Sequence, residues 1–114
     1  MPYLNIQTNR PIPEGTHQEL LHKASQLVAE QLGKPERYVM IALAPPVPML
    51  FAGEDAPAAF LELKSIGLPR DRTPALSAAL CDLLEETLAI PPERVYIEFA
   101  DAPRDLWGWD SATF

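Results

Sequence analysis

The chain has 114 residues, a formal net charge of −7 and a hydrophobic content of 47%. This length suits one domain with a modest core, so we expect a single domain over 1–114. Its nine Lys and Arg are scattered, and no apolar run is long enough to cross a bilayer, so neither nucleic acid nor a membrane is an expected partner.

Pro2 directly follows Met1 and stands before a strand-like stretch at 3–8. If Met1 is removed, Pro2 carries a free secondary amine, and an α-amino group titrates near ~7.7 to 8.0 before any perturbation. Such a group is suited to general base catalysis at neutral pH. If Met1 is retained, the proline nitrogen is an amide without basicity.

The rest of the chain reads as one pattern written twice. Strand-like runs at 3–8 and 38–43 flank a segment with apolar residues at helical spacing, and runs at 60–65 and 95–99 flank a second one. The helical positions are Leu20, Ala24, Leu27, Val28 and Leu32 in the first half, and Leu76, Leu80, Leu83, Leu84 and Leu88 in the second. We therefore predict internal repeats over about 2–44 and 59–100.

Each repeat is expected to be a right-handed βαβ crossover with parallel strands. Two such units side by side predict an α+β fold, with a four-stranded mixed sheet and both helices on one face. The residues expected to meet the helices are Leu4, Ile6, Val39, Ile41, Leu61, Leu63, Val95, Ile97 and Phe99. The opposite face collects Tyr3, Asn5, Tyr38, Met40, Phe60, Glu62, Lys64, Tyr96 and Glu98. It is either solvated or shared with a partner subunit.

Two apolar segments lie outside the repeats, at 47–53 and in an aromatic tail at 104–114. They are interpreted as subunit contacts, as pocket wall, or as segments that pack on the edges of their own core. Cys81 lies in a leucine-rich helical pattern and is expected to be a buried, inert thiol. His17 and His22 are read as surface residues.

Several short motifs occur together in a specific order and spacing. They are Met1-Pro2, Thr8-Asn9, Gly33-Lys34-Pro35 with Tyr38, Ser65-Ile66-Gly67, Arg94-Val95-Tyr96-Ile97 and Gly108-Trp109-Asp110-Ser111-Ala112-Thr113-Phe114. On these motifs the chain resembles, from end to end, the macrophage migration inhibitory factor family of the tautomerase superfamily. The resemblance implies the repeated βαβ fold, assembled as a homotrimer with a central channel and with active sites shared between subunits.

The resemblance also implies a reaction and a site. The amine of Pro2 would move a proton between carbon and oxygen in the keto-enol tautomerisation of phenylpyruvate-like keto acids, with no metal and no cofactor. Lys34 matches the lysine that binds the substrate carboxylate or the enolate charge, although a lysine there also suits a helix end. The remaining matches are Ser65 and Ile66 at the pocket edge, Tyr38, Trp109 and Phe114 in an aromatic wall, and Tyr96 from the neighbouring subunit or, alternatively, in cross-strand packing.

The chain departs from the mammalian cytokine of that family in a few places. Glu98 stands where the cytokine has asparagine, and by strand alternation it faces the same way as Tyr96. A carboxylate there repels anionic substrates and, if close, raises the pKa of Pro2, so we expect weaker activity on such substrates and a pH profile shifted upward. The cytokine's Cys-x-x-Cys pair falls on Ala58 and Leu61, which excludes thiol-disulfide chemistry through that motif. Trp107 either narrows the pocket or only packs beside it.

Two classes of function follow. The first is a cofactor-independent tautomerase for small enolisable keto acids. The alternative is a cytokine-like or protein-binding homologue with weak or vestigial tautomerase activity, whose receptor the sequence does not identify. Dehalogenation or hydration is a third possibility, without a second acid or an arginine pair to favour it. Met1-Pro2-Tyr3 and its neighbours do not resemble a signal peptide, so a cytoplasmic location is expected, with leaderless secretion left open.

Overall fold

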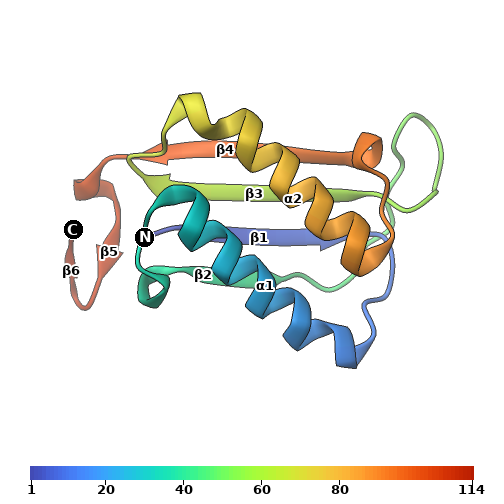
Figure 1. Cartoon of the computed structure of the whole chain (residues 1–114), viewed down its shortest axis with the longest axis horizontal. Coiled ribbons are helices and arrows are strands. Elements are labelled where there is room, and N and C mark those ends of the chain that lie inside the picture. Colours follow the sequence, from blue (N-terminus) through green and yellow to red (C-terminus); the bar gives the residue numbers. More distant parts are fainter.

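A computed structural model describes residues 1–114 and shows a four-stranded sheet with two helices on one face (Figure 1). The strand order is β2-β1-β3-β4. β1 is parallel to β2 and β3 is parallel to β4, whereas β1 and β3 are antiparallel. The predicted α+β fold with two βαβ units is confirmed.

The elements follow the predicted order along the chain. The first unit comprises β1 (Tyr3–Thr8), α1 (Glu14–Leu32) and β2 (Met40–Leu43), and the second comprises β3 (Ala59–Ile66), α2 (Thr73–Leu88) and β4 (Val95–Ala102). The tail adds a hairpin of β5 (Gly108–Trp109) and β6 (Ala112–Thr113), which the sequence analysis did not predict. Neither helix is long and apolar enough to cross a membrane.

Tyr38 was predicted to begin the second strand, and this prediction is wrong. It ends a short 3-10 turn, Glu36–Tyr38. In this turn the backbone N–H of Tyr38 donates to the carbonyl of Pro35 over 3.1 Å. Val39 continues the turn by donating to Glu36 over 3.0 Å. The turn displaces Tyr38 from the sheet, and its ring lies with the C-terminal tail instead.

The core fills the space between the sheet and the helices. Its fully buried members include Leu4 and Ile6 from β1, Leu61 and Leu63 from β3, and a helix set of Leu20, Ala24, Val28, Leu76, Leu80 and Leu84. Ile41, Val95, Ile97 and Phe99 pack against it from the outer strands, and Val39 from just before β2, as predicted. Burial of apolar area of this kind is the main favourable term for a small domain.

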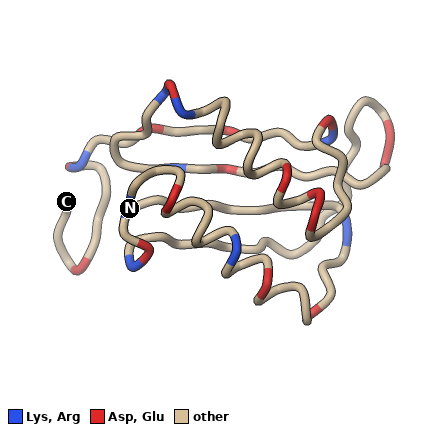
Figure 2. Tube along the Cα trace, viewed as in Figure 1, with Lys and Arg blue, Asp and Glu red and all other residues tan.

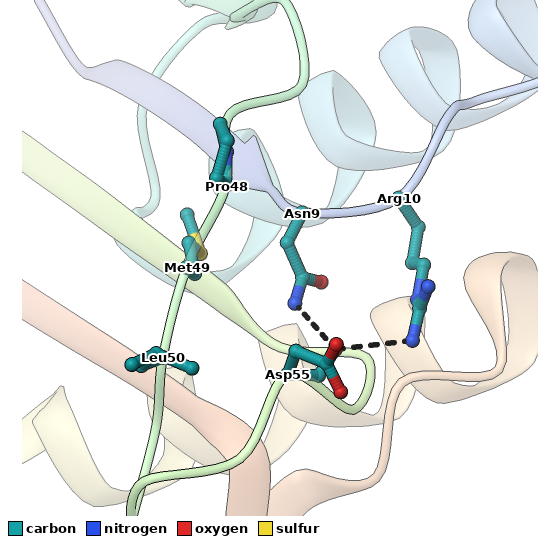
Figure 3. A pocket seen from close by; sticks show the side chains of 6 residues that line it. All are labelled: Asn9, Arg10, Pro48, Met49, Leu50 and Asp55. Carbon is teal, nitrogen blue, oxygen red and sulfur yellow. Dashed lines mark hydrogen bonds between the residues drawn. The ribbon is translucent and has the colours of Figure 1, made fainter.

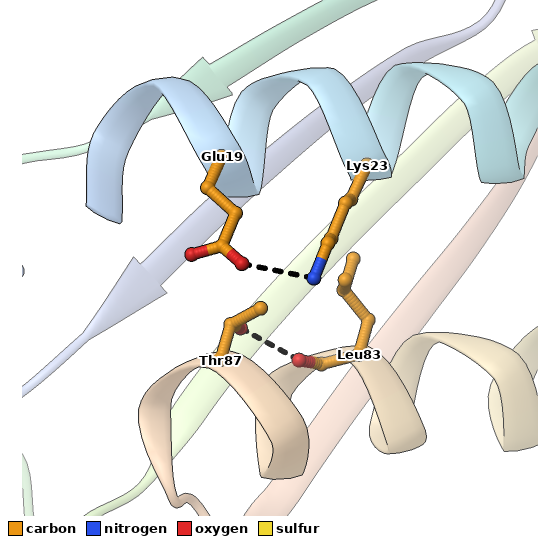
Figure 4. A network of polar contacts seen from close by, with 4 residues as sticks. All are labelled: Glu19, Lys23, Leu83 and Thr87. Carbon is orange, nitrogen blue, oxygen red and sulfur yellow. Dashed lines mark hydrogen bonds and ion pairs between the residues drawn. The ribbon is translucent and has the colours of Figure 1, made fainter. Parts of the chain in front are cut away.

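Polar contacts between and along the two helices are few and local. Figure 4 shows the ion pair of Lys23 with Glu19, 2.9 Å long, and the hydroxyl of Thr87 donating to the carbonyl of Leu83 over 2.6 Å. The first contact lies within α1 and the second within α2, so neither joins the two helices. Exposed ion pairs also stabilise a fold weakly. The helices are therefore held to the sheet and to each other chiefly by apolar packing.

The loop between β2 and β3 is tied to the end of β1 by side chains that bond to its backbone. Asn9 donates to the carbonyls of Asp55 and Ala56 and accepts from the N–H of Ala58, and Arg10 donates to the Asp55 carbonyl over 3.1 Å (Figure 3). Asn9, Arg10 and Asp55 form a groove there with Pro48, Met49 and Leu50. The side chains of Asn9 and Arg10 already donate to backbone carbonyls of the loop, so in this groove they serve to anchor the loop.

Arg94 anchors the same loop from the other side. Its guanidinium donates to the carbonyls of Phe51, Glu54, Ala56 and Pro57 over 2.9 to 3.2 Å. The guanidinium carbon also lies 5.2 Å from the centre of the Phe51 ring. One side chain therefore satisfies four loop carbonyls and sets the position of Phe51.

Three side chains of doubtful role take surface or flanking positions. Cys81 is only partly buried on α2, so the expectation of a buried thiol is corrected. Burial raises its pKa, and the neighbouring acids Asp82 and Glu85 raise it further, which keeps the thiol protonated. His22 is exposed as predicted, and His17 is half-buried near the start of α1.

The two helices end in the same left-handed conformation on different residues. Gly33 ends α1 with φ 61°, and Ala89 ends α2 with φ 55°. The left-handed region suits glycine and costs an alanine about 1 kcal/mol.

We therefore predict that Ala89→Gly raises the free energy of unfolding by about 0.5 to 1 kcal/mol. Ala78→Gly, at an exposed position inside α2, is the matched control and lowers it by about 1 kcal/mol. Urea denaturation of both variants measures the effect. Equal destabilisation by the two changes contradicts the prediction.

Candidate functional site

A pocket of about 450 Å³ lies at one end of the sheet. At this end the N-terminus lies beside the C-terminal hairpin (Figure 1). The pocket volume is in the usual range for small-molecule sites, ~300 to 1,000 Å³. The lining residues are Met1, Pro2, Tyr3, Arg37, Tyr38, Val39, Met40, Lys64, Trp107, Gly108, Trp109 and Phe114. The pocket is therefore formed by the start of β1, the segment that leads into β2, a residue near the end of β3 and the C-terminal tail.

Three aromatic rings form one wall of this pocket. Tyr38 meets Trp109 at a centroid distance of 5.6 Å and Phe114 at 6.0 Å, both edge to face, and Trp109 stacks on Phe114 at 5.2 Å. The hairpin brings the last two together, because Asp110 and Ser111 turn the chain with positive φ. The three rings predicted for an aromatic wall therefore contact one another within one protomer, and their role in binding stays a prediction.

Pro2 is fully buried at the base of the pocket, and its carbonyl accepts the N–H of Met40 over 2.9 Å. Met1 precedes it here, so its nitrogen is a peptide nitrogen and the free amine belongs to Met1. Partial burial, and then the charge of Lys34, hold the pKa of the Met1 amine below its usual value. The region around the N-terminus therefore favours a neutral amine.

Lys34 lies just beyond the end of α1, where its N–H donates to the carbonyl of Ala29 over 3.0 Å. Its side chain is half-buried and forms no ion pair. It does not line the pocket itself, but its charge reaches the terminal amine. Lys34 directly follows Gly33, whose left-handed conformation ends α1.

Ser65 and Ile66 are the last residues of β3, at the same end of the sheet as Pro2. They directly follow Lys64, which pairs with Tyr3. Both are buried, and the Ser65 hydroxyl donates to the Ile66 carbonyl over 3.3 Å. Neither lines the pocket of the single protomer. Their predicted place at a pocket edge stays a prediction.

Tyr96 and Glu98 lie away from Pro2 within the protomer. Tyr96 pairs with Phe60, and Phe60 pairs with Gln7, near the far end of β1. Its ring packs on Phe51 at 4.7 Å in a separate apolar cavity of about 430 Å³. They would reach a Pro2 pocket only from a second subunit, which stays a prediction.

The sequence analysis missed two cations of the pocket, Arg37 and Lys64. Arg37 rests on the Tyr38 ring, with its guanidinium carbon 4.8 Å from the ring centre. Lys64 was placed on the open sheet face without a role, and the repeat aligned it with Gln7. The antiparallel register of β1 and β3, which the repeat did not specify, pairs it with Tyr3 and so puts it beside the chain start.

No group of three or more His, Cys, Asp or Glu side chains lies together, so the structure offers no cluster suited to hold a metal ion. The chemistry of the pocket is instead that of an amine, nearby cations and aromatic rings. Such a set can bind a small anion with a flat apolar part.

Comparison with known proteins identifies the fold and the family. The solved structure of a macrophage migration inhibitory factor homologue from Prochlorococcus marinus superposes with a TM-score of 0.93 and 44% identity, covering 98% of each chain. A protein inactivated by 2-oxo-3-pentynoate superposes with a TM-score of 0.86 and 26% identity, covering 96% of this chain and 93% of the other. The arrangement is the tautomerase-superfamily fold.

The family model for macrophage migration inhibitory factor (MIF) matches residues 1–114. A macrophage migration inhibitory factor homolog from Brugia malayi is 40% identical over 115 residues, covering 100% of this chain and 99% of the relative. The chain therefore belongs to the macrophage migration inhibitory factor family. Family and fold support a function of the MIF or tautomerase kind.

The aromatic wall can be tested in a Trp107→Phe background, where Trp109 is the one remaining tryptophan. We predict that Tyr38→Leu moves the emission of Trp109 to longer wavelength and lowers the free energy of unfolding by about 1 to 2 kcal/mol, because two edge-to-face pairs are lost. Phe99→Leu, which changes an aromatic ring packed against the core and not in the pocket, serves as control and leaves the emission maximum in place. An unchanged spectrum in Tyr38→Leu would show that the rings do not meet.

Proposed function

We propose that this protein is a cofactor-independent keto-enol tautomerase for phenylpyruvate-like α-keto acids, with Pro2 as acid and base after removal of Met1. The observation that carries the proposal is the buried Pro2 at the base of a pocket with an aromatic wall, next to a cation that acts on the chain terminus. The reaction needs a base, a charge partner and a water-poor slot for the ring.

The proton moves in two steps. The neutral Pro2 nitrogen takes a proton from the carbon next to the carbonyl, and the electron pair of that C–H bond becomes the carbon-carbon double bond of an enolate. The same nitrogen then returns the proton to the oxygen, or the steps run in reverse. Lys34 stabilises the negative charge that develops on oxygen, and the rings of Tyr38, Trp109 and Phe114 hold the apolar part of the substrate.

The location of Pro2 supports its role as a base near neutral pH. The Met1 amine, one residue away, already has a lowered pKa because of partial burial and the charge of Lys34. A free Pro2 amine would stand one residue further along the same chain start, where the charge of Lys34 would act on it in the same direction. The neutral form would then persist to lower pH than for an ordinary α-amine.

The structural relative inactivated by 2-oxo-3-pentynoate supports the choice of substrate class. That compound is a 2-keto acid, so a protein of this fold accepts a ligand with the carboxylate and carbonyl that phenylpyruvate also carries. The preference for an aryl group in this chain is supported by the three rings that line its pocket.

A homotrimer with shared sites belongs to the same proposal. The open sheet face supports it, because Tyr96 and Met40 are each 64% exposed there and no element of the chain covers them. A neighbouring subunit would bring Tyr96 and Glu98 to the Pro2 pocket, with Ser65 and Ile66 at its edge. A cytokine-like or protein-binding role is the second candidate, supported by the curated relatives named as macrophage migration inhibitory factors.

We predict that Pro2→Gly lowers kcat/KM for phenylpyruvate enolisation by roughly 100-fold or more, the usual contribution of a positioned general base. Insertion of alanine between Met1 and Pro2 is the matched control, since it keeps the ring and turns its nitrogen into an amide, and it lowers the rate as strongly. Intact mass confirms the processed terminus in each case. Undiminished turnover by the inserted variant overturns Pro2 as the base, and no turnover by a correctly processed wild type favours the binding role.

The pH profile of kcat/KM tests the two charges assigned to the site. We predict that Lys34→Gln moves its acidic limb to higher pH, because loss of a cation raises the pKa of the amine. Glu98→Asn moves the limb to lower pH and raises the rate on anionic substrates, because loss of a nearby carboxylate lowers that pKa. Lys23→Gln, on the outer face of α1, is the control. Coincident profiles for Glu98→Asn and wild type contradict the trimer-shared site.

A further inference from the structure

The pocket holds more positive charge than a monocarboxylate requires. Arg37 and Lys64 line it, no acidic residue does, and Lys34 acts on the terminus from close by. The whole chain carries a net charge of −7, and Figure 2 shows its basic residues as short separate segments. A cationic pocket in an acidic protein points to an anionic ligand rather than to general surface composition.

Neither lining cation has a strong partner within the chain. Lys64 Nζ lies 3.7 Å from Glu62 Oε2, with about half of its side chain exposed, so the pair is loose. Arg37 forms no ion pair and no side-chain hydrogen bond, and only stacks on Tyr38. Both retain donors that can reach a carboxylate oxygen.

The cations also come from different sides of Pro2. Lys64 belongs to β3 and stands opposite Tyr3, whereas Lys34 and Arg37 belong to the segment between α1 and β2. Lys34 is assigned to the keto-acid end of the substrate. Two lining cations, Lys64 from one side and Arg37 from the other, are then left to meet a second negative group.

We propose that the pocket accepts 2-keto dicarboxylates, and that Lys64, with Arg37, binds the second carboxylate. This inference rests on the proposed tautomerase function and names the substrate class of the same site. The reaction is unchanged: a proton leaves the carbon beside the carbonyl for the Pro2 nitrogen and is returned to the oxygen. The second carboxylate takes no part in bond making.

The test compares two keto acids that differ in the second charge. Deuterium exchange at the carbon beside the carbonyl is followed by proton NMR for oxaloacetate and for phenylpyruvate, and the ratio of their kcat/KM values is taken for each variant. Lys64→Gln is expected to lower the ratio of oxaloacetate to phenylpyruvate roughly tenfold, the size of one partly exposed charge-assisted contact. Arg37→Gln lowers it in the same direction.

Two control variants show whether the change in the ratio is due to the positive charge of Lys64. Lys64→Arg retains the wild-type ratio to within a few fold, and Lys23→Gln leaves it unchanged. A neighbouring Glu98 would weaken the binding of both anionic substrates. The test is therefore read from the ratio of the two kcat/KM values and not from either value alone. If phenylpyruvate turns over normally but Lys64→Gln leaves the ratio unaltered, the inference fails while the proposed function stands.

If the wild type exchanges deuterium into neither compound, a binding measurement separates the proposed tautomerase function from the proposed dicarboxylate pocket. Calorimetric titration with malate and with phenyllactate, alcohols that cannot enolise, then gives the same comparison without catalysis. Tighter binding of malate that is lost in Lys64→Gln supports the dicarboxylate pocket and overturns the tautomerase. Equal binding of both alcohols, or no effect of Lys64→Gln on malate, overturns the inference.

Discussion

The antiparallel pairing of β1 with β3 is the contact on which the rest of the structure depends. It joins two βαβ units that are each incomplete as a sheet, and it makes β1 a central strand although it begins the chain. A central strand is buried on its helix face, so the residue before it, Pro2, is buried as well. The same pairing aligns Tyr3 with Lys64 and brings the end of β3 to the N-terminus. The pocket is a consequence of this register.

The repeat and the core could be predicted from the sequence because each depends on local periodicity, whereas the strand order β2-β1-β3-β4 was not predicted. Leu4, Leu63 and Leu80 lie where alternation and helical spacing put them. Tyr38 did not follow, because a 3-10 turn after Pro35 adds hydrogen bonds that strand alternation ignores. The tail hairpin was also missed, since the Asp110-Ser111 turn uses left-handed residues without glycine. Arg37 and Lys64 were missed because their function depends on a cavity formed by distant segments.

The open face of the sheet has an ordered pattern of charge. Across the strands, Tyr3 and Lys64 share one row, Asn5, Glu62 and Glu98 the next, and Gln7, Phe60 and Tyr96 the last. Glu62 and Glu98 are directly paired, and like charges opposite each other on neighbouring strands destabilise a sheet. Lys64 offsets part of this through its contact with Glu62. A substrate carboxylate that draws Lys64 away would uncover that repulsion, so binding and the stability of this face are linked.

The loop clamp connects this face to the proposed shared site. Arg94 bonds to four carbonyls of the loop between β2 and β3 and lies against Phe51, and Phe51 packs on Tyr96. Phe51, which lies against both Arg94 and Tyr96, loses rotamer freedom before any ligand arrives. The entropy cost of binding a ligand against Tyr96 is therefore lower. The same argument holds for Trp109 and Phe114 on the Pro2 side, which are stacked without a substrate. Preorganised rings therefore stand at both places from which the proposed site would be assembled. The groups left to adjust to a bound substrate are the cationic side chains of Lys34, Arg37 and Lys64.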